Sequence, residues 1–177
     1  MRRPRTLLAV LAAVLVAVAA TLLVTGGSSA APTKSQALFE KKLLAGGKTT
    51  SDVKRLLGEG GGFVSPDITF ADLTGDGRSD AIVLVETGGV AGAVALYVFS
   101  TDGEAQDSDL RVVYRSQRLY RVSAEVDNAE LIVRTPRFAE GDDVCCPAKI
   151  VQRTYTWRAG SGTLRLRSSR ETDGPAR

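Results

Sequence analysis

A short acidic loop between two apolar runs constrains the fold of this chain more than any other stretch. The loop covers residues 72–80, Asp-Leu-Thr-Gly-Asp-Gly-Arg-Ser-Asp, with carboxylates at its first, fifth and ninth positions. Apolar residues lead into the loop at 68–71 and out of it at 81–85. Because short apolar runs bounded by turn residues are typical of strands, we predict a strand-loop-strand unit in a β-rich domain.

The spacing of the oxygen-bearing side chains in this loop predicts a calcium site. Calcium takes about six to eight oxygen ligands, and a calcium loop supplies them from positions 1, 3, 5, 7 and 9, with glycine at position 6. The matching positions hold Asp72, Thr74, Asp76, the backbone carbonyl of Arg78, and Asp80. We therefore expect one structural calcium ion that joins the two strands.

Two features set this loop apart from an EF-hand, and a metal-free interpretation stays open. Val83 stands where an EF-hand has its bidentate glutamate, and Thr74 stands where Asn or Asp would be a stronger ligand. Without metal, the aspartates would instead accept hydrogen bonds from backbone N–H groups of the turn. Calcium is favoured because three neighbouring carboxylates repel one another unless a cation or several donors neutralise them.

The N-terminus has the pattern of an export signal. Three arginines at positions 2, 3 and 5 precede an uncharged apolar run over residues 7–24, and small residues follow at 28–31. This order predicts a signal peptide over residues 1–31, cleaved after Ala31. The alternative is a retained signal anchor, because the apolar run approaches the length of a membrane-spanning helix. Both interpretations place the domain outside the cytoplasm.

Charge and composition exclude several function classes. Apart from the three leader arginines, the chain balances its 20 Asp and Glu with as many Lys and Arg, so nothing favours a nucleic-acid partner. The chain has no histidine, which removes the commonest general base and metal ligand. No nucleophile, base and orienting group can be assigned from spacing. We therefore expect a protein that is not an enzyme, with a hydrolase as the less favoured alternative.

Periodicity predicts an α+β fold that is mostly antiparallel β. A helix is expected over residues 33–45, with Thr33 and Gln36 at capping-box spacing, and a second over 52–57 capped by Ser51. A glycine-rich linker closes this 32–62 segment, and a meandering sheet of about seven or eight strands follows over 63–168. A polar tail is expected over 169–177. The predicted strands are 63–70, 81–86, 93–100, 110–115, 119–126, 130–135, 150–157 and 163–167.

Two of these strands differ from the rest in pattern. Residues 82–85 and 94–99 are continuously apolar, which is typical of central strands covered on both faces. The later strands alternate, and they carry arginines at Arg153, Arg158, Arg165 and Arg167. These arginines indicate the solvated face of a half-buried sheet, with a basic ligand-binding face as the alternative.

The two cysteines of the chain, Cys145 and Cys146, are adjacent. In an exported protein an even count favours a disulfide. Consecutive Cα atoms lie about 3.8 Å apart, below the usual disulfide separation of about 4.4 Å or more. Three interpretations stay open: a vicinal disulfide, two free thiols, or bridges to a partner. A redox-responsive module that uses this pair is the alternative function.

The order of these features resembles a known protein family. The acidic loop, a later Gly88-Gly89 pair and the Cys145-Cys146-Pro147 run before Tyr155-Thr156-Trp157 look like the LppP/LprE family of actinobacterial envelope lipoproteins and their secreted relatives. The loop itself resembles the calcium loops of FG-GAP and VCBS repeats. The resemblance implies an envelope location without an established activity. The lipidated cysteine of those lipoproteins has no counterpart here.

Together these observations predict an exported, secreted or envelope-associated β-domain. We expect a non-catalytic binding or accessory module, stabilised by calcium, for an unknown envelope or extracellular ligand. A membrane contact is expected only through an uncleaved N-terminal segment.

Overall fold

The computed structural model describes residues 32–101 and 110–175 of the 177-residue chain. The predicted leader and its cleavage site at Ala31 lie outside the described residues. Within the described part, no helix has both the length and the apolar character needed to cross a membrane.

Two short helices open the domain. Helix α2 covers Lys34–Ala45. Thr33 forms the predicted capping box, in which its hydroxyl accepts from the Gln36 amide at 3.2 Å and its own amide donates to the Gln36 side chain at 2.8 Å. Helix α3 covers Ser51–Gly58. Its cap is Thr50 and not the predicted Ser51, because the Thr50 hydroxyl accepts from the Val53 amide at 3.4 Å.

The first sheet is antiparallel throughout and is centred on β3 and β4. Strand β4 pairs with β3 on one side and β5 on the other, while β1 and β2 both pair with β3. The predicted strand at 63–70 is thus two short strands, separated around Pro66, which has no N–H to donate. The bounds are β1 Phe63–Val64, β2 Thr69–Ala71, β3 Asp80–Glu86, β4 Ala93–Thr101 and β5 Leu110–Gln117.

The second sheet is an antiparallel meander of four strands in the order β6-β7-β8-β9. The last strand runs well past the expected end of the domain, so residues 169–173 pair with β8 and are not part of a polar tail. The bounds are β6 Ser123–Asp127, β7 Glu130–Arg137, β8 Lys149–Arg158 and β9 Thr163–Asp173, with a short 3-10 turn at Ala159–Ser161 before β9.

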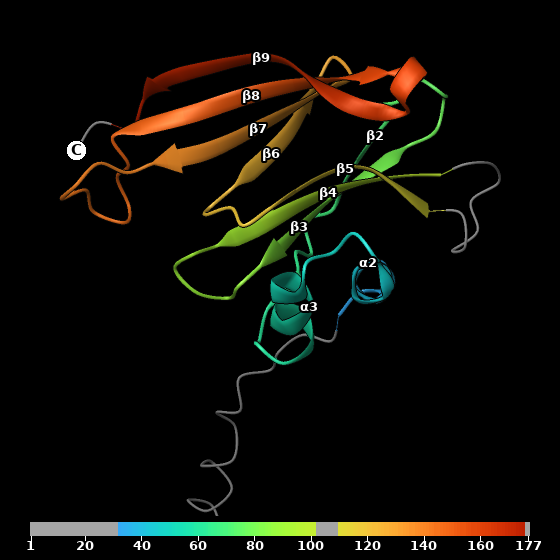
Figure 1. Ribbon diagram of the computed structural model, residues 1–177, viewed down its shortest axis with the longest axis horizontal. Coiled ribbons are helices and arrows are strands. Elements are labelled where there is room, and N and C mark those ends of the chain that lie inside the picture. Colours follow the sequence, from blue (N-terminus) through green and yellow to red (C-terminus); the bar gives the residue numbers. More distant parts are fainter. Residues whose placement is uncertain (1–31, 102–109, 176–177) are drawn as a thin grey trace, which may run out of the picture. The chain divides into compact units, whose positions relative to one another are not determined.

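These elements form three layers, with the first sheet between the helices and the second sheet (Figure 1). Phe39 and Leu43 of α2 pack on Val83 and Val85 of β3 in one hydrophobic cluster. The opposite face of the first sheet packs on the second sheet in another cluster. That second cluster includes Ile82, Leu96, Val98, Leu131, Val133 and Leu164. Strands β3 and β4 therefore contribute to both clusters, as their continuous apolar sequence predicted.

The chain passes from one sheet to the other over residues 118–122. Arg118 and Arg121 adopt positive φ angles of 59° and 47°, which are uncommon for residues other than glycine. Three backbone bonds hold this segment against β4 and the residues before it: Leu119 N to Val94 O, Arg121 N to Ala91 O, and Val122 N to Ala93 O. This crossing divides the predicted meander into two sheets, and the α+β, mostly antiparallel class is confirmed.

Each of the two hydrophobic clusters has a buried or half-buried tyrosine. Ionisation of these tyrosines should lower the free energy of unfolding at alkaline pH. Burial raises the pKa of Tyr97 to about 12. Burial and a hydrogen bond with Tyr155 also raise the pKa of Tyr114. Both groups favour the folded state while they are protonated. Their contribution should be complete below the unfolded pKa of about 10, and the Tyr97 part should fade as the pH rises toward about 12.

Urea denaturation at increasing pH tests this expectation. Tyr97→Phe and Tyr114→Phe should each flatten the alkaline loss of unfolding free energy, whereas Tyr120→Phe, at a more exposed ring, should leave it unchanged. A stability that is constant from about pH 9 to 12 would contradict the burial of both rings.

Candidate functional sites: an acidic loop and a disulfide loop

The acidic loop is the connection of the β2–β3 hairpin. Ala71 at the end of β2 pairs with Asp80 at the start of β3, so the strands hold both ends of the loop together. Gly75 and Gly77 have φ angles of 74° and 81°, which glycine adopts without a steric cost. The sequence prediction of a strand-loop-strand unit is confirmed.

The aspartates of this loop turn inward onto its backbone. Asp72 accepts from the Gly75 amide at 2.6 Å and, through its other oxygen, from the Gly77 amide at 2.9 Å. Asp76 accepts from the Arg78 amide at 2.9 Å. These contacts match the metal-free interpretation of the loop, in which carboxylates satisfy the N–H groups of a tight turn.

Asp80 is the buried member of the set, with 1% of its surface exposed. One oxygen, Oδ2, accepts from the amides of Leu73 at 2.8 Å and Thr74 at 3.0 Å. Its other oxygen, Oδ1, and the Thr74 hydroxyl are both buried and have no hydrogen-bond partner. Buried polar atoms without partners are uncommon in folded proteins and call for an explanation such as a bound ion or water.

The predicted calcium ligands are thus placed in one loop, but they do not form a ready-made metal cluster. Among the described residues, no three His, Cys, Asp or Glu side chains are grouped so that they could hold a metal ion. Asp80 Oδ1 and Thr74 Oγ1 are buried oxygens without a hydrogen-bond partner, so a cation could bind to them without displacing an amide. Calcium binding stays a prediction.

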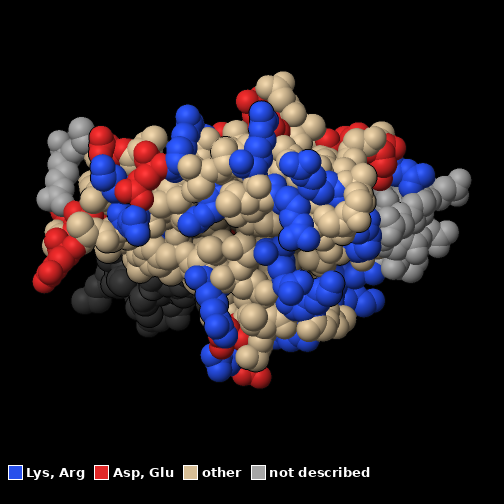
Figure 2. Space-filling view, turned by 45° about the horizontal axis from the view of Figure 1, so that its top comes forward, with Lys and Arg blue, Asp and Glu red and all other residues tan. Residues whose placement is uncertain are grey.

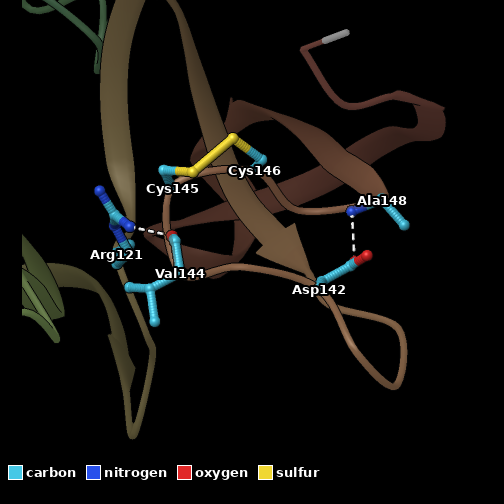
Figure 3. Close-up of a disulfide and its surroundings, with 6 residues drawn as sticks. All are labelled: Arg121, Asp142, Val144, Cys145, Cys146 and Ala148. Atoms are coloured by element: carbon cyan, nitrogen blue, oxygen red, sulfur yellow. Dashed lines mark hydrogen bonds between the residues drawn. A yellow bond between two sulfur atoms is a disulfide. The ribbon is translucent and has the colours of Figure 1, made fainter. Parts of the chain in front are cut away.

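The second candidate site is the loop between β7 and β8, where the structure bonds Cys145 to Cys146. Asp142 anchors this loop by accepting from the amides of Ala139 and Ala148, each at 2.7 Å. Arg121 donates to the carbonyl oxygen of Val144, next to the bridge (Figure 3). The pair therefore lies on a loop that is tied to its own ends and to the crossing segment.

The end of β9 packs tightly against the same loop. The Gly174 amide donates to the Ala148 carbonyl at 2.9 Å. A Cβ atom at Gly174 would lie 1.8 Å from the carbonyl oxygen of Pro147, so no larger residue fits here without moving the loop. The extension of β9 beyond its predicted end thus positions Cys145-Cys146-Pro147.

Beside this loop the surface is hollowed by a cavity of about 270 Å³, which we call the disulfide hollow. Its lining includes Arg121, Arg134, Pro136, Phe138, Cys145 and Ile150. Arg134, Pro136 and Ile150 lie on the outer face of the second sheet, opposite the buried side chains of Leu131 and Val133. Sequence reasoning missed the hollow because it brings together residues from a crossing segment, three strands and a loop.

Polar contacts fix the orientation of Arg134 at the edge of the hollow. Its guanidinium donates to Glu125 at 2.5 Å and to the side-chain oxygen of Gln152 at 3.1 Å. The hydrogen bond from Arg134 lowers the pKa of the Glu125 carboxyl, so this pair stays ionised at neutral pH. Arg170 donates to the same Gln152 oxygen at 3.0 Å, which brings a second guanidinium close by.

The two acidic-loop carboxylates at Asp76 and Asp80 should differ in their effect on stability. Asp80→Ala leaves the buried Leu73 amide without an acceptor and should lower the unfolding free energy by about 2–3 kcal/mol in metal-free buffer. Asp76→Ala removes an exposed contact and should cost less than about 1 kcal/mol. Urea denaturation of both variants with chelator present measures the difference, and equal losses would contradict the buried role of Asp80.

Comparison with known proteins shows sequence similarity over about half of this chain. No family profile matches the chain, and no solved structure matches it. Over 93 residues the chain is 32% identical to a protein named lipoprotein CseA from Streptomyces avermitilis, a stretch that covers 52% of this chain and 41% of that protein. The chain thus spans less than half the length of this relative. The similarity agrees with the broad lipoprotein resemblance, while the LppP/LprE, FG-GAP and VCBS affiliations stay predictions.

Proposed function

We propose that this chain is an exported, envelope-associated β-domain that acts as a non-catalytic binding or accessory module and holds one calcium ion in its 72–80 loop. The envelope location draws on two independent features. One is the export pattern of the N-terminal sequence. The other is the similarity to a protein that is named a lipoprotein.

The observation that carries the calcium proposal is the pair of buried, unpartnered oxygens in the loop, Asp80 Oδ1 and Thr74 Oγ1. Both are hard oxygen donors of the kind that calcium prefers. Asp72, Asp76 and the Arg78 carbonyl would complete the ligand set from the same loop. A bound cation would satisfy the two orphaned atoms. Its role would be to hold β2 and β3 together.

The non-catalytic part of the proposal rests on chemistry that the chain lacks. It contains no histidine. Most acidic side chains described outside the loop are exposed, and several of them form surface ion pairs, as Glu171 does with Arg137 and Asp173 with Lys149. Such pairs stabilise a fold weakly and offer no general base in a cleft. The redox alternative keeps one supporting observation, the exposed position of Cys145 in its loop.

Calcium should raise the melting temperature of the chain relative to a sample with chelator. At a calcium concentration of about 100 times Kd, binding stabilises the folded state by about 2.7 kcal/mol. For a domain of this size that is a shift of roughly 5–10 °C. Calorimetry or fluorescence melting with added calcium and with chelator measures the shift.

Two variants show whether the effect comes from this loop. Asp76→Ala should abolish the difference between the calcium and chelator samples. Asp67→Ala removes an exposed carboxylate a few residues before the loop and should leave the difference intact. Identical melting curves with calcium and with chelator in the unaltered chain would refute the calcium proposal.

A further inference from the structure

We propose that the disulfide hollow is a binding site for a small cyclic carboxylate, about the size of one sugar ring. This inference rests on the binding role proposed above and is independent of the calcium loop. The cavity of about 270 Å³ lies just below the usual range for drug-sized ligands, about 300–1,000 Å³, so one ring with a charged group fits its dimensions.

The charged side chains that line the hollow favour an anionic ligand. Arg121 and Arg134 line the hollow, and no acidic residue does. Arg121 donates to a backbone carbonyl and makes no ion pair with any described residue. Arg134 uses one nitrogen to donate to Glu125 and another to donate to Gln152, and its guanidinium has further N–H groups that could donate to a ligand. The planar guanidinium has the geometry to bind a carboxylate through two parallel hydrogen bonds.

Charges of both signs surround the hollow, and one more arginine lies close to Arg134. Arg170 lies beside Arg134, since both donate to one oxygen of Gln152. Figure 2 turns the top of Figure 1, where β8 and β9 lie, toward the viewer. Lys and Arg side chains gather over the middle of this surface, and most Asp and Glu side chains lie toward its margins. The basic middle of this surface would attract an anionic ligand toward the sheet.

The other residues that line the hollow are mostly apolar and favour a ligand that contains a ring. Pro136, Phe138 and Ile150 give the cavity an apolar surface. Cys145, an exposed residue, adds its disulfide to the lining, and sulfur is polarizable and makes favourable contacts with aromatic rings. The Phe138 ring is held edge-on by Tyr120 at 5.6 Å between ring centres. A lining that combines an apolar surface with two arginines fits a ligand with one hydrophobic face and one charged end.

The hollow is also held in its shape before any ligand binds. Asp142 ties the two ends of the loop together, and Gly174 packs directly on Pro147. Gln152 and Glu125 fix the guanidinium of Arg134. A site whose side chains are already ordered loses less conformational entropy on binding, which raises affinity for a small ligand.

A larger hollow of about 460 Å³ lies beside α3, but its charges are already matched. Asp52 in its lining pairs with Arg55 at 3.2 Å and with Arg118 at 3.8 Å. These neighbouring groups neutralise one another, so this larger cavity has less to attract an anion. In the disulfide hollow Arg134 pairs with Glu125 outside the lining, but Arg121 makes no ion pair with a described residue and no acid lines the cavity, which favours it as the anion site.

Calorimetric titration of the oxidised full chain tests the proposal with two matched pairs of probes. Glucuronate and glucose represent the sugar source, while benzoate and benzyl alcohol represent the aromatic source. At least one acid should bind, and its uncharged counterpart should bind about tenfold more weakly or not at all, because it lacks the charge-assisted hydrogen bonds. The acid that binds identifies the source, and binding of both supports a site that recognises ring and carboxylate alone.

Variants locate the binding. Arg134→Gln should weaken the acid about tenfold. Arg165→Gln, on the same outer face but outside the hollow, should leave the affinity unchanged and controls for general charge. Far-ultraviolet circular dichroism and melting curves check that both variants fold. Reduction followed by alkylation of the cysteines should also weaken binding, since it removes the disulfide wall.

Each titration is repeated with calcium and with chelator. The results then distinguish failure of the anion site from failure of the calcium site. Acid binding without any calcium effect on melting would refute the calcium site alone. A calcium effect without binding of either acid up to millimolar concentrations would overturn the disulfide hollow as an anion site. Binding that Arg134→Gln leaves unchanged would also overturn it.

Discussion

The burial of β3 and β4 on both faces is the constraint on which the rest of the structure depends. Val83 and Val85 face the helices, while Ile82 faces the second sheet. Strand β4 repeats this division, with Leu96 and Val98 in the cluster between the sheets. Removing one such aliphatic side chain from water is worth about 1.5–3 kcal/mol. Two adjacent strands with this pattern fix a three-layer arrangement, because each face needs its own cover.

Both candidate sites are attached to this central pair. The acidic loop ends at Asp80, the first residue of β3, so its buried carboxylate is fixed where the doubly covered strand begins. The disulfide hollow is connected to β4 through the crossing segment, where the Arg121 and Val122 amides donate to Ala91, just before β4, and to Ala93, its first residue. Rigid central strands therefore position two loops that carry the polar chemistry, as is common for functional loops.

Local signals in the sequence predicted much of this fold. Thr33 and Gln36 identified the start of α2, and the apolar runs at 82–85 and 94–99 identified the two central strands. Asp127 and Asn128 are residues typical of tight turns, and they lie at the β6–β7 hairpin, where Asn128 and Ala129 take positive φ angles of 49° and 59°. Each of these features is decided by residues within a few positions of one another.

Features that depend on distant contacts could not be predicted. The division into two sheets follows from the crossing at residues 118–122, whose left-handed Arg118 and Arg121 carry no sequence signature. Strand β9 was expected to end early because its last residues are polar, yet β8 provides them with a hydrogen-bonding partner. The spacing of aspartates identified the acidic loop but left the calcium and metal-free interpretations both open, and it did not determine that Asp72 and Asp76 turn onto backbone amides.

Native-state hydrogen exchange measures the central role of β3 and β4 most directly. The amides of Val83, Val85, Leu96 and Val98 should exchange only when the whole domain unfolds, whereas amides at residues 168–173 at the exposed end of β9 should exchange through local fraying. Protection that is highest in β3 and β4 agrees with a structure organised around this pair. Exchange of these four amides as fast as that of residues 168–173 would contradict it.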